Sequence, residues 1–157
     1  MGKVMKNTCF FLGHHFAPQA LRPLLEDAVE RHIADYGVTQ FIVGSYGSFD
    51  AMAAGAVIRA KSQHNGISLL RLLPYHPSER APDVPDGFDG TFYPAGMETV
   101  PHRAAIVRAN EYVLRHVCDY LICFDRYSAT KTHVFLEIAK TQERKRALHI
   151  ENLADRV

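Results

Sequence analysis

The sequence predicts an α/β fold with a five-stranded parallel β-sheet, and two observations lead to this expectation. Short apolar runs alternate along the chain with longer stretches in which apolar residues recur at helical spacing. Most of the apolar runs are separated by intervals that fit right-handed crossover connections through a helix. The strand order 3-2-1-4-5 is expected, because it places the chain reversal between strands 1 and 4.

Five apolar segments are expected to be the strands: residues 8–12, 40–43, 68–73, 120–124 and 147–150. Four amphipathic segments are expected to be the helices: residues 18–36, 51–63, 101–116 and 132–143. Pro18 is acceptable in the first turn of the first helix, and Gly37 is a stop signal. Asp50 is expected to be the N-cap of the second helix.

The chain has 157 residues, of which 47% are hydrophobic, which suits a single domain over residues 1–157 with a substantial core. A proline- and glycine-rich stretch at residues 74–100 interrupts the alternation. We expect it to be a loop insertion that leaves the carboxyl end of the third strand. A loop of this length is often a lid or a binding loop, and a surface or subunit-contact role is equally open.

The charge balance excludes several classes of partner. The formal net charge is +1, so no basic patch for duplex nucleic acid or for an anionic membrane is indicated.

No signal-peptide pattern and no apolar run of ~20 residues is found, so we expect a cytoplasmic protein without a membrane partner. Cys9, Cys118 and Cys123 lie in or beside apolar segments and are expected to be buried free thiols.

The segments that follow strands 1 to 4 meet at one edge of a parallel sheet, and they carry the candidate ligand-binding residues. Strand 2 leads into a glycine-containing turn and a helix start, which can present backbone N–H groups to a phosphate. A lysine precedes another helix start after strand 4. The candidates are Gly13, His14, His15, Gly44, Ser45, Tyr46, Gly47, Asp50, Ser128, Thr130, Lys131 and Thr132. Arg103, on the helix before strand 4, is expected either to contact the ligand or to have a surface or dimer role.

Some of these side chains have two interpretations. Asp50 can cap the second helix, and it can also accept a hydrogen bond from a ribose or a base. Tyr46 and Phe49 can stack on a base or pack beneath the turn. The sequence leaves these alternatives open.

Common cofactor motifs are absent from the expected positions. The first strand is followed by Gly13-His14-His15 instead of a G-x-G-x-x-G dinucleotide fingerprint, and no phosphate-binding Walker motif is present. His14 and His15, with His76 and His102 on neighbouring loops, raise the question of a metal site. Adjacent side chains point apart in an extended chain, and no H-x-x-x-H spacing is found. Neither a metal nor a cofactor is predicted.

Three stretches carry a family resemblance: Cys9 to His15, Gly44 to Asp50 with Met52-Ala53-Ala54, and Arg108-Ala109-Asn110 with Cys118 to Ile122. They resemble the T-G-H-R-like turn, the G-x-x-G-x-F-D-like turn and the S-D-Y-V-I-like strand of small bacterial members of the SLOG superfamily. This superfamily joins the nucleotide-binding domains of DNA-processing protein A to the Lonely Guy cytokinin-activating hydrolases. The resemblance spans residues 8–150. It implies a Rossmann-like three-layer sandwich that binds a nucleotide-derived ligand, often as a homodimer.

The Lonely Guy hydrolases use the glutamate of a P-G-G-x-G-T-x-x-E segment and an arginine to split the N-glycosidic bond of nucleoside monophosphates. The resemblance places that glutamate at Glu137 and the arginine at Arg108. The paired glycines of the segment are replaced here by Thr130-Lys131, and its threonine by Val134. A glycine-built phosphate cradle is therefore missing.

These patterns predict a nucleotide-derivative-binding domain that acts as a sensor or accessory protein. The alternative is a nucleotide N-glycoside hydrolase that uses Glu137 and Arg108. A second alternative is a dimeric interaction module with a vestigial pocket.

Overall fold

The computed structural model describes residues 7–157 and has an open α/β architecture. All strand pairs in its sheet are parallel, and the sheet has six strands in the order β4-β3-β2-β1-β5-β6. The strands are β1 (Thr8–Gly13), β2 (Gln40–Val43), β3 (Ser68–Leu72), β4 (Gly90–Phe92), β5 (Tyr120–Phe124) and β6 (His149–Asn152). The helices are α1 (Arg22–Ala34), α2 (Ser48–Lys61), α3 (Ala105–His116) and α4 (Lys131–Arg146).

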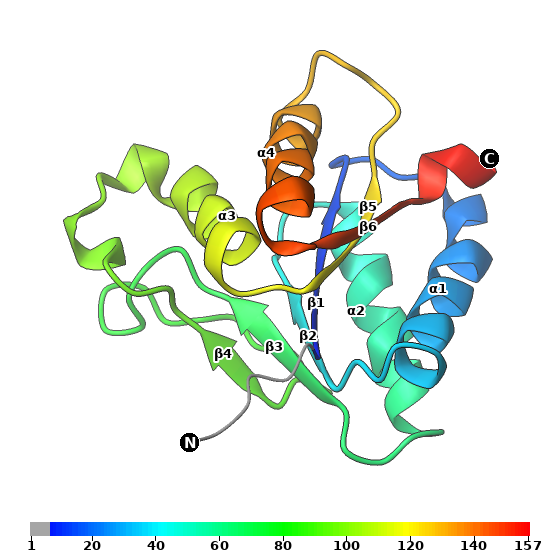
Figure 1. The fold of residues 1–157 in the computed structure, drawn as a ribbon. Helices are drawn as coiled ribbons and strands as arrows, with labels where there is room; N and C mark the ends of the chain where they lie inside the picture. The colour runs from blue at the N-terminus through cyan, green and yellow to red at the C-terminus, as the bar shows by residue number, and fades with distance from the viewer. Residues whose placement is uncertain (1–6) are drawn as a thin grey trace.

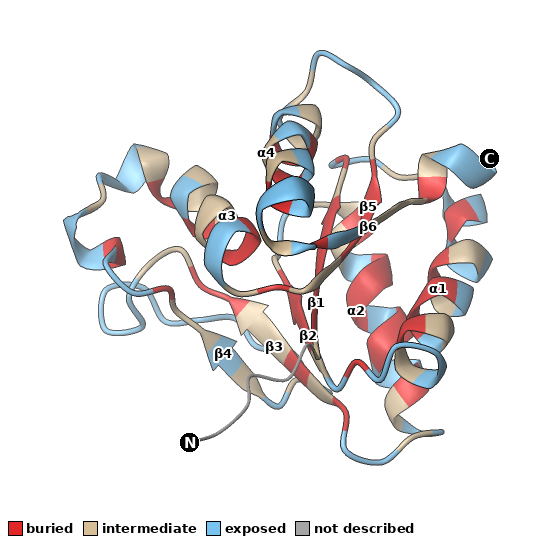
Figure 2. Ribbon diagram, viewed as in Figure 1, coloured by how far each residue is buried: buried red, intermediate tan, exposed pale blue. Residues whose placement is uncertain are grey.

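The sheet lies between two helical layers (Figure 1), with α1 and α2 on one face and α3 and α4 on the other. Alternate residues of β1 enter different cores: Cys9 and Phe11 pack with α1 and α2, while Phe10 and Leu12 pack with α3 and α4. Figure 2 shows the buried residues concentrated along the central strands. Burial of both faces explains why β1 is a continuous apolar run rather than an alternating one.

The expected five-stranded sheet is wrong in strand number, and the sheet order differs accordingly. The additional strand, β4, lies within the proline-rich segment 74–100, which was expected to be a loop throughout, and forms the sheet edge beside β3. Asp89 fixes this pairing because its Oδ2 accepts hydrogen bonds from Leu69 N–H (2.8 Å) and Lys61 Nζ (2.6 Å). Strand β4 has only three residues and no long alternating apolar pattern, and the Asp89 carboxylate helps to hold it beside β3.

Several element boundaries also differ from the expectation. Helix α2 begins at Ser48 with Gly47 as its N-cap, so Asp50 lies within the first turn and is not the cap. The final strand begins at His149 rather than Ala147, because Ala147 adopts a left-handed conformation (φ 58°) that ends α4. Helices α1 and α3 are each preceded by a short 3₁₀ turn, Gln19–Leu21 and His102–Ala104.

The three cysteines are buried and unpaired with one another. Within residues 7–157, no helix combines the length and the apolar character needed to cross a membrane.

Because every strand pair is parallel, the carboxyl ends of β1, β2, β3 and β5 lie at one edge of the sheet. The segments that follow these strands enclose a cavity at that edge.

Candidate functional site

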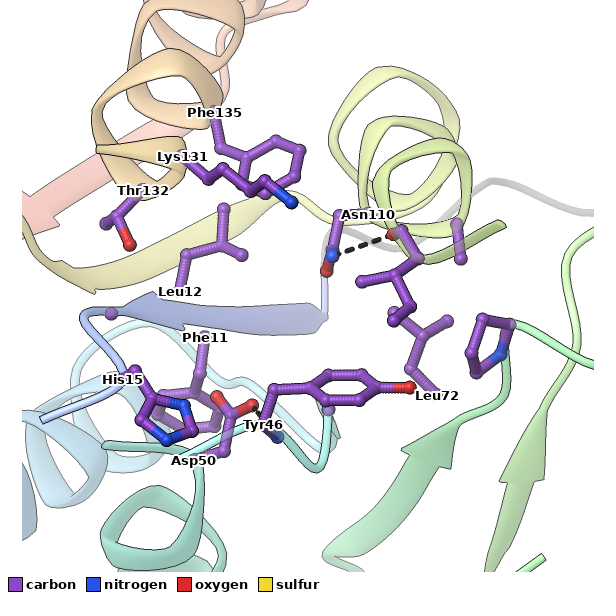
Figure 3. Close-up of a pocket in the computed structure, with 15 residues that line it drawn as sticks. Phe11, Leu12, His15, Tyr46, Asp50, Leu72, Asn110, Lys131, Thr132 and Phe135 are labelled. Carbon is purple, nitrogen blue, oxygen red and sulfur yellow. Dashed lines mark hydrogen bonds between the residues drawn. The ribbon is translucent and has the colours of Figure 1, made fainter. Parts of the chain in front are cut away.

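A cavity of about 320 Å³ opens at the carboxyl edge of the sheet, above the end of β1. Figure 3 shows Tyr46, Asp50 and His15 on one side of it and Lys131, Thr132 and Phe135 on the other. Its lining residues are Phe11, Leu12, Gly13, His15, Gly44, Tyr46, Asp50, Leu72, Pro74, Ile106, Ala109, Asn110, Lys131, Thr132 and Phe135. Apolar walls with a few convergent polar groups are typical of sites for small organic ligands.

The turn before α2 is packed directly against the loop that follows β1. Gly47 has φ 113°, and a Cβ at this position would lie 2.5 Å from the carbonyl oxygen of His15. Ser48 N–H donates to that same oxygen (2.7 Å), and Ser48 Oγ accepts from Ala17 N–H (2.7 Å). Only glycine satisfies both the conformation and the space, so Gly47 is required to build this wall.

Asp50 is the acidic group in the cavity wall. Its Oδ2 accepts a hydrogen bond from Tyr46 N–H (2.9 Å), and it stands next to Gly44, where a Cβ would lie 3.1 Å from that oxygen. Burial raises the pKa of Asp50 to about 6, although the Tyr46 N–H bond, Arg71 and His15 all act to lower it. Asp50 therefore changes its charge near neutral pH and can donate or accept a proton in the cavity.

The N-terminus of α4 forms the opposite wall. Thr130 is its N-cap, and the Thr130 Oγ1 accepts a hydrogen bond from His133 N–H (3.2 Å). Within residues 7–157, the backbone N–H groups of Lys131 and Thr132 have no hydrogen-bond partner, as is usual for the first turn of a helix. Together with the Lys131 ammonium, they provide a positive site at the cavity.

A buried carboxylate supports this wall from behind. Asp125, with a side chain 5% exposed, accepts a hydrogen bond from His133 Nδ1 (2.7 Å). The Nε2 of His14 accepts from Arg126 N–H (2.8 Å), and burial lowers the pKa of His14 below its ordinary value. His14 and Asp125 thereby hold the chain between β5 and α4 against the loop that follows β1.

The structure places most of the candidate residues at the cavity, but not all. Gly13, His15, Gly44, Tyr46, Asp50, Lys131 and Thr132 line it. Gly13 is a close-approach position, because the ring of Phe49 occupies the space that a Cβ would need. Phe49 is thus buried in the core and packs beneath the turn, whereas Tyr46 faces the cavity.

The remaining candidates lie elsewhere. Gly47 shapes the wall through its packing against His15, and Ser45 borders a neighbouring hollow. His14 and Thr130 line another hollow, which shares His15, Lys131 and Thr132 with the cavity. Ser128 and Arg103 are exposed and do not line the cavity.

The structure does not bring Glu137 and Arg108 together at the cavity. Glu137 is exposed on α4, where its carboxylate lies 3.4 Å from Lys140 Nζ. Arg108 borders a separate hollow on the other side of α3, beside Tyr112 and His116. Neither residue lines the central cavity.

Sequence reasoning missed Asn110 of α3 and the Asp125–His133 pair. Asn110 lines the cavity, and its Nδ2 donates to the carbonyl of Ile106 (2.9 Å), which leaves its side-chain oxygen available. Asn110 belongs to one of the stretches that resemble the SLOG superfamily, and this position in the sequence could have indicated that it lies at the site. Asp125 directly follows an apolar strand and had a comparable signal.

No model of a known protein family matches the chain, and the search of curated proteins gives no match either. Within residues 7–157, no three side chains of histidine, cysteine, aspartate or glutamate are arranged to hold a metal ion.

Proposed function

We propose that this protein binds a nucleotide or a nucleotide-derived ligand at the carboxyl edge of its sheet, as a sensor or accessory protein. The observation that carries the proposal is the unpartnered N-terminus of α4, with Lys131, at the wall of a largely apolar cavity. A helix N-terminus beside a cationic side chain favours a phosphate.

The rest of the cavity suits the neutral part of such a ligand. Its volume of about 320 Å³ accommodates a group of the size of a nucleoside. Leu72, Ile106 and Phe135 offer apolar contacts to a planar ring. Asp50 and the side-chain oxygen of Asn110 offer hydrogen bonds to hydroxyl or amino groups. The resemblance to the SLOG superfamily supports the same class of ligand.

Isothermal titration calorimetry with AMP, ADP-ribose and UDP-glucose tests the proposal. We expect at least one of them to bind, and Lys131→Ala to weaken that binding about tenfold, as the loss of one charge-assisted contact predicts. Lys145→Ala is the matched control, since Lys145 is exposed in the last turn of the same helix.

Equal losses in both variants would contradict the placement of the phosphate. If none of the three compounds binds, the interaction module becomes the better description, and sedimentation velocity would then measure whether the expected homodimer forms.

The second candidate function is N-glycoside hydrolysis of a nucleoside monophosphate, and the observation that favours it is Asp50. A buried carboxyl whose pKa is about 6 suits a general acid, whereas Glu137 is exposed outside the cavity. Release of adenine from AMP, followed by chromatography, is the test. An enzyme of this kind should lose activity in Asp50→Asn and keep it in Glu137→Ala. Absence of adenine release by the wild-type protein would exclude it.

A further inference from the structure

A second hollow of about 290 Å³ lies beside the central cavity and shares three of its lining residues, Tyr46, Leu72 and Pro74. We call it the arginine chamber, because Arg71 and Arg80 both line it. Arg71 is on β3, and Arg80 is in the segment that follows β3. The chamber and the central cavity are therefore neighbouring compartments with Tyr46 in the wall of each.

Arg71 is held in a fixed orientation but keeps donors unused. Its guanidinium lies over the ring of Phe88, 4.6 Å from the centroid, and its Nη1 donates to the carbonyl oxygen of Asp83 (3.1 Å). The Nε of Arg71 is buried and has no hydrogen-bond partner. A buried donor without an acceptor costs free energy, so this N–H is a position where a ligand oxygen would be stabilising.

Arg80 is oriented in the same way. Its guanidinium lies over the ring of Tyr75, 4.1 Å from the centroid, and the Tyr75 hydroxyl donates to the carbonyl of His102 (3.4 Å). An arginine stacked on an aromatic ring keeps the donors at its edge available for a planar or tetrahedral anion.

Neither arginine is neutralised by a partner. Within residues 7–157, no carboxylate lies within 4.0 Å of the Arg71 or the Arg80 guanidinium, whereas Arg31 and Arg156 have such a partner. The acidic residue in the chamber wall, Asp83, offers its backbone carbonyl to Arg71. Two oriented and unpaired guanidinium groups in one hollow favour an anionic group as its occupant.

The chamber is also electrostatically connected to the central cavity. Burial is the main cause of the raised pKa of Asp50, and Arg71 acts in the opposite direction. Burial likewise raises the pKa of Tyr46, and Arg80 is among the groups that oppose this rise. The two cations are thus close enough to influence groups that a ligand in the central cavity would contact.

We propose that the arginine chamber binds a second anionic group of the ligand, a phosphate or a carboxylate, at the end remote from α4. This inference rests on the proposed function and narrows it. The favoured ligand is a nucleotide derivative with two separated anionic groups, one at Lys131 and Thr132 and the other at Arg71 and Arg80.

Matched ligand pairs test the inference by calorimetry. AMP and adenosine 3′,5′-bisphosphate differ by one phosphate, and UDP-glucose and UDP-glucuronate differ by one carboxylate. We expect the compound with the additional anionic group, adenosine 3′,5′-bisphosphate or UDP-glucuronate, to bind about tenfold more tightly than the other member of its pair. The pair that shows the difference identifies the anion. Arg80→Gln should remove this preference. The control, Arg144→Gln, should retain it, because Arg144 is exposed on α4 outside the chamber.

The outcomes separate this inference from the proposed function. Binding of nucleotides with no preference within either pair, or a preference that survives Arg80→Gln, would overturn the chamber and leave the proposed function intact. If no nucleotide binds, inorganic pyrophosphate is titrated while the Nε–H resonances of the arginines are followed by NMR. A shift of the Arg71 resonance that Arg80→Gln abolishes would support the chamber alone, and the absence of a shift would overturn it.

Discussion

The N-termini of α2 and α4 lie on opposite sides of the end of β1, and they differ in what their backbone donors contact. At α2, the Ser48 N–H donates to the His15 carbonyl, and the preceding Tyr46 N–H donates to Asp50. At α4, the Thr130 Oγ1 accepts from His133 N–H, while the N–H groups of Lys131 and Thr132, two residues that line the cavity, have no partner within residues 7–157.

The comparison shows that the backbone donors of a glycine-containing turn can be bonded to the protein's own acceptors. The turn from Gly44 to Asp50 has the sequence features of an anion cradle, but the Asp50 carboxylate of the same turn already accepts a hydrogen bond from Tyr46 N–H and lies against Gly44. Asp50 also repels a second anion whenever it is ionised. The less glycine-rich turn before α4 is the better candidate for the phosphate.

The largest expected effect comes from a substitution at Gly47, where the turn before α2 packs against His15. Gly47→Ala would place a Cβ against the His15 backbone at a φ of 113°, so we expect the free energy of unfolding to fall by about 4 kcal/mol. Urea denaturation measures the change. Gly55→Ala is the matched control: Gly55 has open space around its Cβ position in the middle of α2, so this variant should gain about 0.5–1 kcal/mol. Equal effects would mean that Gly47 is not a close-approach position.

The second prediction concerns the charge of Asp50. Because the folded-state pKa is raised from 3.8 to about 6, the folded protein binds more protons than the unfolded chain between these values. The stability of the wild type should therefore decrease as the pH rises through this window, by up to about 3 kcal/mol, and stay lower above it. Asp50→Asn keeps an acceptor for Tyr46 N–H and should lack this decrease.

Thermal unfolding of both proteins at pH 4 and pH 8 measures the difference. We expect Asp50→Asn to exceed the wild type in stability at pH 8 and to lose that advantage at pH 4. Glu137→Gln changes an exposed carboxyl and should follow the wild type at both values. An Asp50→Asn variant that is less stable than the wild type at pH 8 would contradict the raised pKa.

The smallest expected effect is at the cap of α4. Thr130→Ala removes the acceptor for His133 N–H and should lower the free energy of unfolding by ~1 kcal/mol, whereas Thr130→Ser should retain most of it. Urea denaturation measures both variants. The alanine variant should also bind AMP more weakly, because the cap orients the first turn. Unchanged stability in Thr130→Ala would show that the cap contributes nothing.

Much of the fold could be predicted, because strands with both faces buried produce unmistakable apolar runs. The expected bounds of β2 and β5 match the structure, and β1 differs by only one residue. Strand β4 could not be predicted in this way. It has three residues in a proline- and glycine-rich segment, and its pairing depends on Asp89 reaching back to Leu69, a contact between residues 20 positions apart.

The sequence by itself determined the α/β alternation and the edge at which the candidate residues gather, because both follow from local periodicity and from the parallel geometry of the sheet. Only the tertiary structure decided which backbone donors near the two helix starts bond within the protein, that Asp50 lines the cavity, and that Glu137 and Arg108 do not. The physical reason is range: the contacts that fix the cavity walls, such as Ser48 with His15 and Arg126 with His14, join residues 33 and 112 positions apart. Local sequence patterns contain no record of such pairings.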